Sequence, residues 1–161
     1  EFEKQSVIAV ASIYGVDLMM DNVIACRERL YDIWNKEYEA ICKKEVSEDC
    51  REAVRFILSR NIVCGNALSL KLVDDEGNDT EEPIVFSEWA FVMGNKMQRK
   101  DYRFDKLLAG DYEPKAKKKK KRIETEGQMS LLSILEDKPS DEGEFLTSYV
   151  ADYRRIQDHG E

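Results

Sequence analysis

The stretch SIYGVDLMMD, residues 12–21, decides the fold. Residues 13–16 form a short apolar run around one glycine, which is typical of a strand, and Asp17 follows where that strand should end. A helix is expected to begin at Asp21, with that residue as its N-cap. A strand, an acidic residue at its carboxyl end and a helix that folds back form half of a repeating unit of an open α/β sheet, in which ligands bind beyond the strand ends. Asp17 would there accept both hydroxyls of a ribose, or it caps the next helix.

Length and composition favour one domain, or one domain with a tail. The chain has 161 residues and 42% hydrophobic content, which is enough for a modest core. It contains no signal peptide and no apolar run long enough to cross a membrane, so we expect a cytoplasmic protein without a membrane partner. The four cysteines form no Cys-x-x-Cys pair and His159 is the one histidine, so no metal site is expected.

Charge is strongly segregated along the chain. The formal net charge is −8, yet residues 115–122 hold seven basic residues and no acid. The acidic remainder would repel nucleic acid, whereas the basic run would attract phosphate. This run is interpreted either as a tether for DNA or as a solubilising linker, and we expect it to be disordered because its charges repel one another.

Apolar spacing predicts a helix before residue 13, one from Asp21 and one from Ser47. In the helix from Asp21 we expect Arg27 on the solvated face. Asn61 is expected to end the third helix in a left-handed conformation. The inner faces of the second and third helices are predicted as Val23, Cys26, Leu30, Ile33 and Trp34, and as Cys50, Ala53, Val54, Ile57 and Leu58.

The rest of the chain predicts further strands and a tail. A strand is expected at 62–64, an acidic turn at 74–82, buried runs at 84–86 and 89–93, and a strand or loop with a short helix at 96–111. A last helix is expected at 144–156. The predicted organisation is an α/β domain over 1–112, a lysine-rich linker over 113–127 and a tail with short helices over 128–161.

Two segments resemble cofactor motifs of the N6-adenine DNA methyltransferases of restriction-modification and phage systems, which use S-adenosylmethionine. The first segment is IYGVDL (13–18) with the following DNV and CRERL, and the second is NIVCGNAL (61–68). The resemblance covers roughly residues 9–108. It implies a mostly parallel, Rossmann-like sheet that is incomplete at its amino end and is followed by a flexible carboxyl tail.

The resemblance also implies roles for individual residues. Asp17 would hold the cofactor ribose, and Leu18 would pack on the cofactor's adenine. Asn66, with Ala67, would contact that adenine where the family usually has an Asp, and an amide oxygen would accept the hydrogen bond without charge assistance. A plain turn residue is the other interpretation of Asn66.

Two departures from the family affect the expected activity. The Gly-x-Gly loop of the family is absent from residues 1–161, which we interpret as a truncation. The catalytic motif, Asn or Asp followed by Pro-Pro and an aromatic, would fall at GNKMQ (94–98), where Asn95 is followed by neither proline nor aromatic. Asn95 would accept one hydrogen bond from the target adenine, which must leave the DNA stack to react.

The sequence therefore gives two functional hypotheses. The first is a DNA adenine methyltransferase, or a fragment of one, that acts on DNA with S-adenosylmethionine. The second is a non-catalytic module of the same fold that binds DNA or a protein. In the tail, QMSLL (128–132), which begins at Gln128, resembles the peptide that docks bacterial proteins on the replication sliding clamp; an ordinary packing helix is the alternative.

Overall fold

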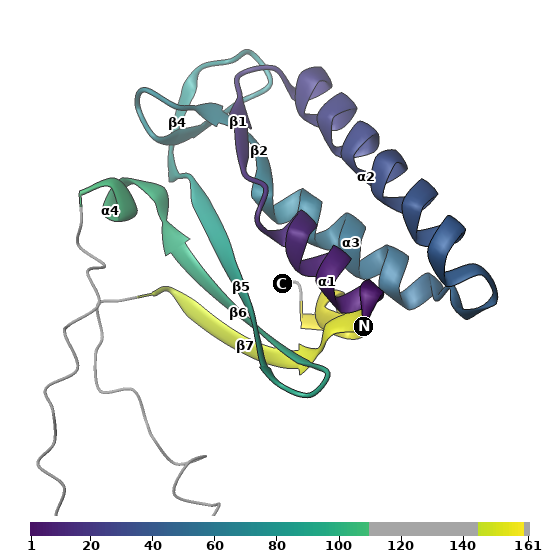
Figure 1. The fold of residues 1–161 in the computed structure, drawn as a ribbon. Coiled ribbons are helices and arrows are strands. Elements are labelled where there is room, and N and C mark those ends of the chain that lie inside the picture. The colour runs from purple at the N-terminus through teal and green to yellow at the C-terminus, as the bar shows by residue number, and fades with distance from the viewer. Residues whose placement is uncertain (110–144, 160–161) are drawn as a thin grey trace, which may run out of the picture.

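The structure, a computed structural model, describes residues 1–109 and 145–159. It is a mixed α/β fold, so the predicted class is confirmed at that level (Figure 1). The lysine-rich run and the clamp-like peptide lie outside the described residues. The helical elements are α1 (Phe2–Ala11), α2 (Met20–Cys42), η1 (Lys43–Glu45), α3 (Glu48–Asn61), α4 (Phe104–Leu108) and η2 (Tyr153–His159). The strands are β1 (Gly15–Asp17), β2 (Ile62–Asn66), β3 (Lys71–Val73), β4 (Asp79–Pro83), β5 (Val85–Met93), β6 (Lys96–Arg103) and β7 (Thr147–Asp152).

The described strands form two sheets, in the orders β1-β2-β3-β4 and β5-β6-β7. Of these strands, β1 and β2 are the one parallel pair, and all other pairings are antiparallel. The expectation of a mostly parallel sheet was wrong for the described part of the chain. Parallel pairing needs a long crossover, and α2, η1 and α3 supply one between β1 and β2. Short turns join β2 to β3, β3 to β4 and β5 to β6, and such turns produce antiparallel neighbours.

α2 packs beside β1 and β2, and α1 and α3 pack against α2 and against each other (Figure 1). The inner face predicted for α3 is confirmed, since all five of its residues are buried. The face predicted for α2 was partly wrong. Cys26 is exposed and Ile33 is 66% exposed, whereas Arg27 is half-buried. The Arg27 guanidinium turns inward because it donates to the carbonyls of Ser59 and Ile62, at 3.0 and 2.9 Å, where α3 passes into β2.

Asn61 does not end α3 in a left-handed conformation, as we had expected. It is fully buried in the last turn, and Ile62 follows with extended backbone angles. Its side-chain amide donates to the Ala11 carbonyl at 2.9 Å and accepts from the Trp89 indole at 2.9 Å. Asn61 therefore joins α1, α3 and β5 in the core, which a local turn signal does not reveal.

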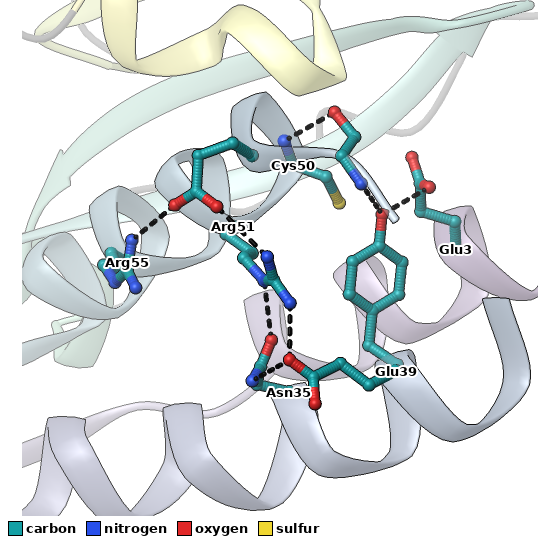
Figure 2. Close-up of polar contacts among 9 residues, drawn as sticks. Glu3, Asn35, Glu39, Cys50, Arg51 and Arg55 are labelled. Atoms are coloured by element: carbon teal, nitrogen blue, oxygen red, sulfur yellow. Dashed lines mark hydrogen bonds and ion pairs between the residues drawn. The ribbon is translucent and has the colours of Figure 1, made fainter. Parts of the chain in front are cut away.

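Polar contacts fasten α2 to α3, as Figure 2 shows. Arg51 of α3 donates to Asn35 at 2.8 Å and forms an ion pair with Glu39, both on α2. Ser47, where the helix was expected to begin, caps α3 by accepting from the Cys50 N–H at 3.3 Å. These contacts fix the crossover that aligns β1 with β2.

The C-terminal described residues belong to the same folded body. Residues 147–152 form β7 along β6 and continue into η2, so the helix predicted over 144–156 was wrong. Glu3 of α1, 8% exposed, accepts hydrogen bonds from Tyr38 of α2, from Tyr153, and from Arg154 at 2.6 Å. This buried carboxylate ties η2 to the amino-terminal helices.

Three further details differ from the expected elements. The buried runs expected at 84–86 and 89–93 belong largely to one continuous strand, β5. The acidic turn expected at 74–82 includes part of β4. Asp21 lies in the first turn of α2, and Met19 rather than Asp21 occupies the N-cap. None of the helices in the described ranges has the length and apolar character needed to span a membrane.

Candidate functional site

The parallel pair brings two of the predicted site residues to one end of the sheet. In the register of β1 and β2, Asp17 lies beside Cys64, and Asn66 ends β2 two residues further on. Beyond parallel strand ends, polar side chains are placed to meet a ligand. The carboxyl ends of β1 and β2, which hold Asp17 and Asn66, therefore lie at the same edge of the sheet.

One carboxylate oxygen of Asp17 is fixed and the other is open. Oδ1 accepts the Met19 N–H at 2.8 Å and the Asn22 side-chain amide at 3.2 Å. No described residue donates a hydrogen bond to Oδ2. Asp17 does not cap α2, because Met19 is the N-cap and no side chain caps the helix. Oδ1 instead accepts the N–H of Met19 just before the helix begins. The open oxygen leaves Asp17 able to accept a hydroxyl from a ligand.

Leu18 and Cys64 close the strand end beside Asp17. The Leu18 side chain is 50% exposed, so it offers an apolar surface to solvent, and the Cys64 thiol lies 3.5 Å from the Leu18 carbonyl. Burial, and next to it the Asp17 carboxylate, raises the pKa of the Cys64 thiol. The site therefore combines a carboxylate, an apolar side chain and a neutral thiol.

Asn66 is used by the turn that follows β2. Its side-chain oxygen accepts the N–H groups of Leu68 and Ser69, at 2.9 and 3.4 Å, and its amide donates to Asp79 at 2.9 Å. Hydrogen bonds from Ser69 and Asn66 lower the pKa of Asp79. The turn interpretation accounts for the printed contacts of the Asn66 side chain, and the turn leaves Ala67 exposed.

A groove of about 740 Å³ runs beside β1. We call it the aromatic groove and define it by six of its lining residues: Tyr14, Val16, Phe86, Glu88, Tyr102 and Phe104. Ala67 also lines it, so the groove is continuous with the turn after β2. Its volume falls in the range of small-molecule sites, and its lining is mostly apolar.

The rings of the aromatic groove are held by one another. Phe86 is buried and meets Tyr14 and Phe104 edge-on, with ring centroids 5.3 and 5.0 Å apart. The Tyr14 hydroxyl donates to the Ser87 carbonyl at 2.7 Å. Burial, and then the Glu88 carboxylate, raises the pKa of Tyr14, so its hydroxyl stays protonated.

Asn95 lies elsewhere in the molecule. It is in the turn between β5 and β6, and its carbonyl accepts the Tyr153 N–H at 2.9 Å. In the same turn the Gly94 carbonyl accepts from Lys4, in the first turn of α1, at 3.0 Å. β5 therefore runs from the aromatic groove back toward the beginning of α1.

The strand direction separates Asn95 from the other predicted site residues. Figure 1 draws the β5–β6 hairpin near the N-terminus, away from the end of β1 where α2 begins. Asp17 and Leu18 lie at the carboxyl end of β1, and Asn66 and Ala67 lie at the carboxyl end of the neighbouring β2, whereas Asn95 lies in the β5–β6 turn. The motif expects Asn95 at the carboxyl end of a parallel strand, but β5 belongs to the separate antiparallel sheet and pairs with β6 rather than with β1 or β2.

Asn22 was not identified as a site residue from the sequence, nor was the outer wall of the aromatic groove, which consists of Glu88, Tyr102 and Phe104. Asn22 lies five residues after Asp17, a spacing that brings it back to the strand end in the first turn of a helix, so a signal existed. Glu88, Tyr102 and Phe104 come from β5, β6 and α4. Their approach to β1 depends on how the two sheets pack, for which the sequence offers no local signal.

No protein-family model matches the chain, and no curated protein and no solved structure matches it at a significant level. Among residues 1–109 and 145–159, no cluster of three or more His, Cys, Asp or Glu side chains could hold a metal ion. The geometry at the ends of β1 and β2 is therefore the observation that bears on function.

Proposed function

We propose that the chain is the cofactor-binding part of an S-adenosylmethionine-dependent DNA adenine methyltransferase, with a Rossmann-like arrangement around β1 and β2. The single observation that carries this proposal is the Asp17 carboxylate at the carboxyl end of the parallel pair, with Oδ1 fixed by Met19 and Asn22 and Oδ2 open. A carboxylate in this position suits a ribose hydroxyl pair. DNA is the proposed acceptor, and the proposed location is cytoplasmic.

Neighbouring residues complete the proposed cofactor contacts. Leu18 offers an apolar surface beside Asp17, and the Asn66 turn presents Ala67 on the other side. Asn66 acts here as a positioning residue, because its polar atoms are engaged within the turn. The resemblance also implies a glycine loop, and a strand carrying such a loop would add to the sheet along the edge of β1 that pairs with no described strand.

A second candidate function is supported by the placement of Asn95. A methyltransferase needs groups that take the hydrogens of the target amine near the cofactor. Asn95 lies at the other end of β5, and the residues that follow it are Lys96 and Met97 rather than prolines. A non-catalytic module of this fold, which binds DNA or a protein partner, is therefore the alternative.

Calorimetric titration of S-adenosylhomocysteine into the wild-type chain and the Asp17→Ala variant tests the proposal. We expect binding to the wild type and a loss of at least about tenfold in affinity for Asp17→Ala, because a ligand hydrogen bond to a charged group is lost. Asp21→Ala is the matched control, since this exposed acid contacts the Asn22 N–H at 2.8 Å but does not lie at the strand end.

The two candidate functions give different results in this experiment. Binding that depends on Asp17 and not on Asp21 supports the methyltransferase proposal. Absence of S-adenosylhomocysteine binding in the wild type, with DNA or protein binding retained in both variants, would favour the non-catalytic module.

A further inference from the structure

We propose that the aromatic groove binds an adenine ring whose exocyclic amino group donates to the Glu88 carboxylate. The choice of adenine among amino-bearing rings rests on the proposed function, in which both the cofactor and the acceptor carry it. The stacking surface and the acceptor follow from the geometry of the groove itself.

Stacking surface comes from aromatic rings that are already fixed. Phe86 meets Tyr14 and Phe104 edge-on, so packing against Phe86 holds both of these rings. Tyr14 is further held by its hydrogen bond to the Ser87 carbonyl. A planar ring that enters the groove therefore orders few side chains, which favours binding by stacking.

Glu88 is the charged group that lines the groove. The Tyr102 hydroxyl donates to its Oε2 at 3.0 Å, which holds the carboxylate in place, and no described residue donates to Oε1. An ionised carboxylate accepts hydrogen bonds and cannot donate them. No described residue lining the groove is basic. This charge pattern selects a ring with an amino group and disfavours a phosphate or carboxylate.

The residues that line the groove include chain neighbours of the proposed ribose contact, although Asp17 itself does not line it. Val16, which lines it, precedes Asp17 on β1, and Ala67 follows Asn66 at the end of β2. A ring in the groove and a ribose at Asp17 could belong to one adenosine of the cofactor. An adenine turned out of a DNA strand would present the same ring, so the shared chemistry is the aminopurine edge.

Adenosine and inosine distinguish this site from a merely apolar groove. Inosine carries a carbonyl oxygen where adenosine carries the amino group, and that oxygen would face the Glu88 carboxylate. We expect the wild-type chain to prefer adenosine by at least about tenfold. Bound inosine would place its carbonyl oxygen against the Glu88 carboxylate, and two acceptors form no hydrogen bond. The titration is followed by calorimetry.

Glu88→Gln should change this preference rather than abolish binding. The glutamine amide can donate to the inosine oxygen, so inosine should gain affinity while adenosine loses it. A gain of affinity cannot come from a misfolded variant. Glu81→Gln is the matched control, because Glu81 is an exposed acid on β4 that does not line the groove, and it should keep the wild-type ratio.

Either of two results would overturn the proposal: equal affinity of the wild-type chain for the two nucleosides, or an adenosine-to-inosine ratio that Glu88→Gln leaves unchanged. Failure of the ribose contact would look different. Asp17→Ala would then leave the affinities for adenosine and for inosine unaltered. The groove would still prefer 9-methyladenine to 9-methylhypoxanthine, because neither base carries a ribose.

Competition identifies the source of the ring. Displacement of adenosine by S-adenosylhomocysteine would assign the groove to the cofactor. Displacement by a single-stranded oligothymidine with one central deoxyadenosine, but not by oligothymidine alone, would assign it to DNA. Adenosine binding that neither competitor reduces would contradict an adenine site of the proposed function.

Discussion

The side-chain amide of Asn22 lies 3.2 Å from Asp17 Oδ1, so the first turn of α2 holds the acid at the end of β1. Both residues are accessible to solvent, and Asn22 has no place in the buried core. Asn22 is therefore a positioning residue whose loss should affect ligand binding more than stability.

Asn22→Ala should lower the affinity for S-adenosylhomocysteine about fivefold, which corresponds to one ordinary hydrogen bond of about 1 kcal/mol. The free energy of unfolding should change by less than about 0.5 kcal/mol, as for other exposed positions. Calorimetry and urea unfolding measure the two quantities. An Asn22→Ala variant with unchanged affinity would show that Met19 alone suffices to orient Asp17.

Glu3→Gln should destabilise the fold by about 2 kcal/mol. The amide that replaces the carboxylate cannot accept from Tyr38, Tyr153 and Arg154 together, and it removes the charge that pairs with Arg154. Chemical denaturation provides the measurement. Glu39→Gln is the control, because Glu39 also pairs with an arginine but is 53% exposed, and such pairs contribute little.

Stability should fall as the solution is acidified. Burial alone would raise the pKa of Glu3, but hydrogen bonds from Arg154, Tyr153 and Tyr38 outweigh it and lower that pKa below its ordinary value. A carboxyl with a lowered pKa in the folded state stabilises the fold above its unfolded pKa, and that contribution is lost as the pH falls through the folded pKa.

This contribution should begin to fall near the ordinary pKa of a glutamate carboxyl, where the unfolded chain takes up its proton, and should be lost as the pH falls through the lower folded pKa. The free energy of unfolding, measured across the acidic range, should therefore fall less steeply in Glu3→Gln than in the wild type. Parallel curves for the two proteins would show that Glu3 is not the carboxylate responsible.

Thiol labelling tests which face of α2 points inward. Cys26 is exposed, whereas Cys50 is fully buried and burial raises its pKa to about 12. In variants that retain one cysteine, Cys26 should react rapidly with a chromogenic disulfide reagent, and Cys50 should react only after unfolding. Protection of Cys26 would favour the helix face expected from spacing alone over the observed one.

The sequence predicted elements whose signals are local. The inner face of α3 follows from its apolar periodicity, and its beginning near Ser47 follows from the acids in its first turn. The face of α2 was misjudged at Cys26 and Arg27 because adjacent helix positions differ by about 100°, and what each meets is decided by its partners. Arg27 meets the carbonyls at the end of α3, which no pattern within α2 records.

The remaining differences come from long-range pairing. Residues 147–152 form β7 because β6 offers a free edge, and their own propensity did not decide between helix and strand. The position of Asn95 follows from the direction of β5, and the outer wall of the aromatic groove follows from the packing of two sheets. Such contacts join residues far apart in the chain, so local sequence carries little information about them.

The most direct test of the central claim is a thermodynamic cycle between Asp17 and the ribose hydroxyls. Dissociation constants are measured for adenosine and 2′,3′-dideoxyadenosine with the wild-type chain and with Asp17→Ala. Our account predicts that the wild type prefers adenosine by about tenfold or more and that Asp17→Ala loses this preference. An equal preference in both proteins would contradict the account, because the hydroxyls would then be recognised by something other than Asp17.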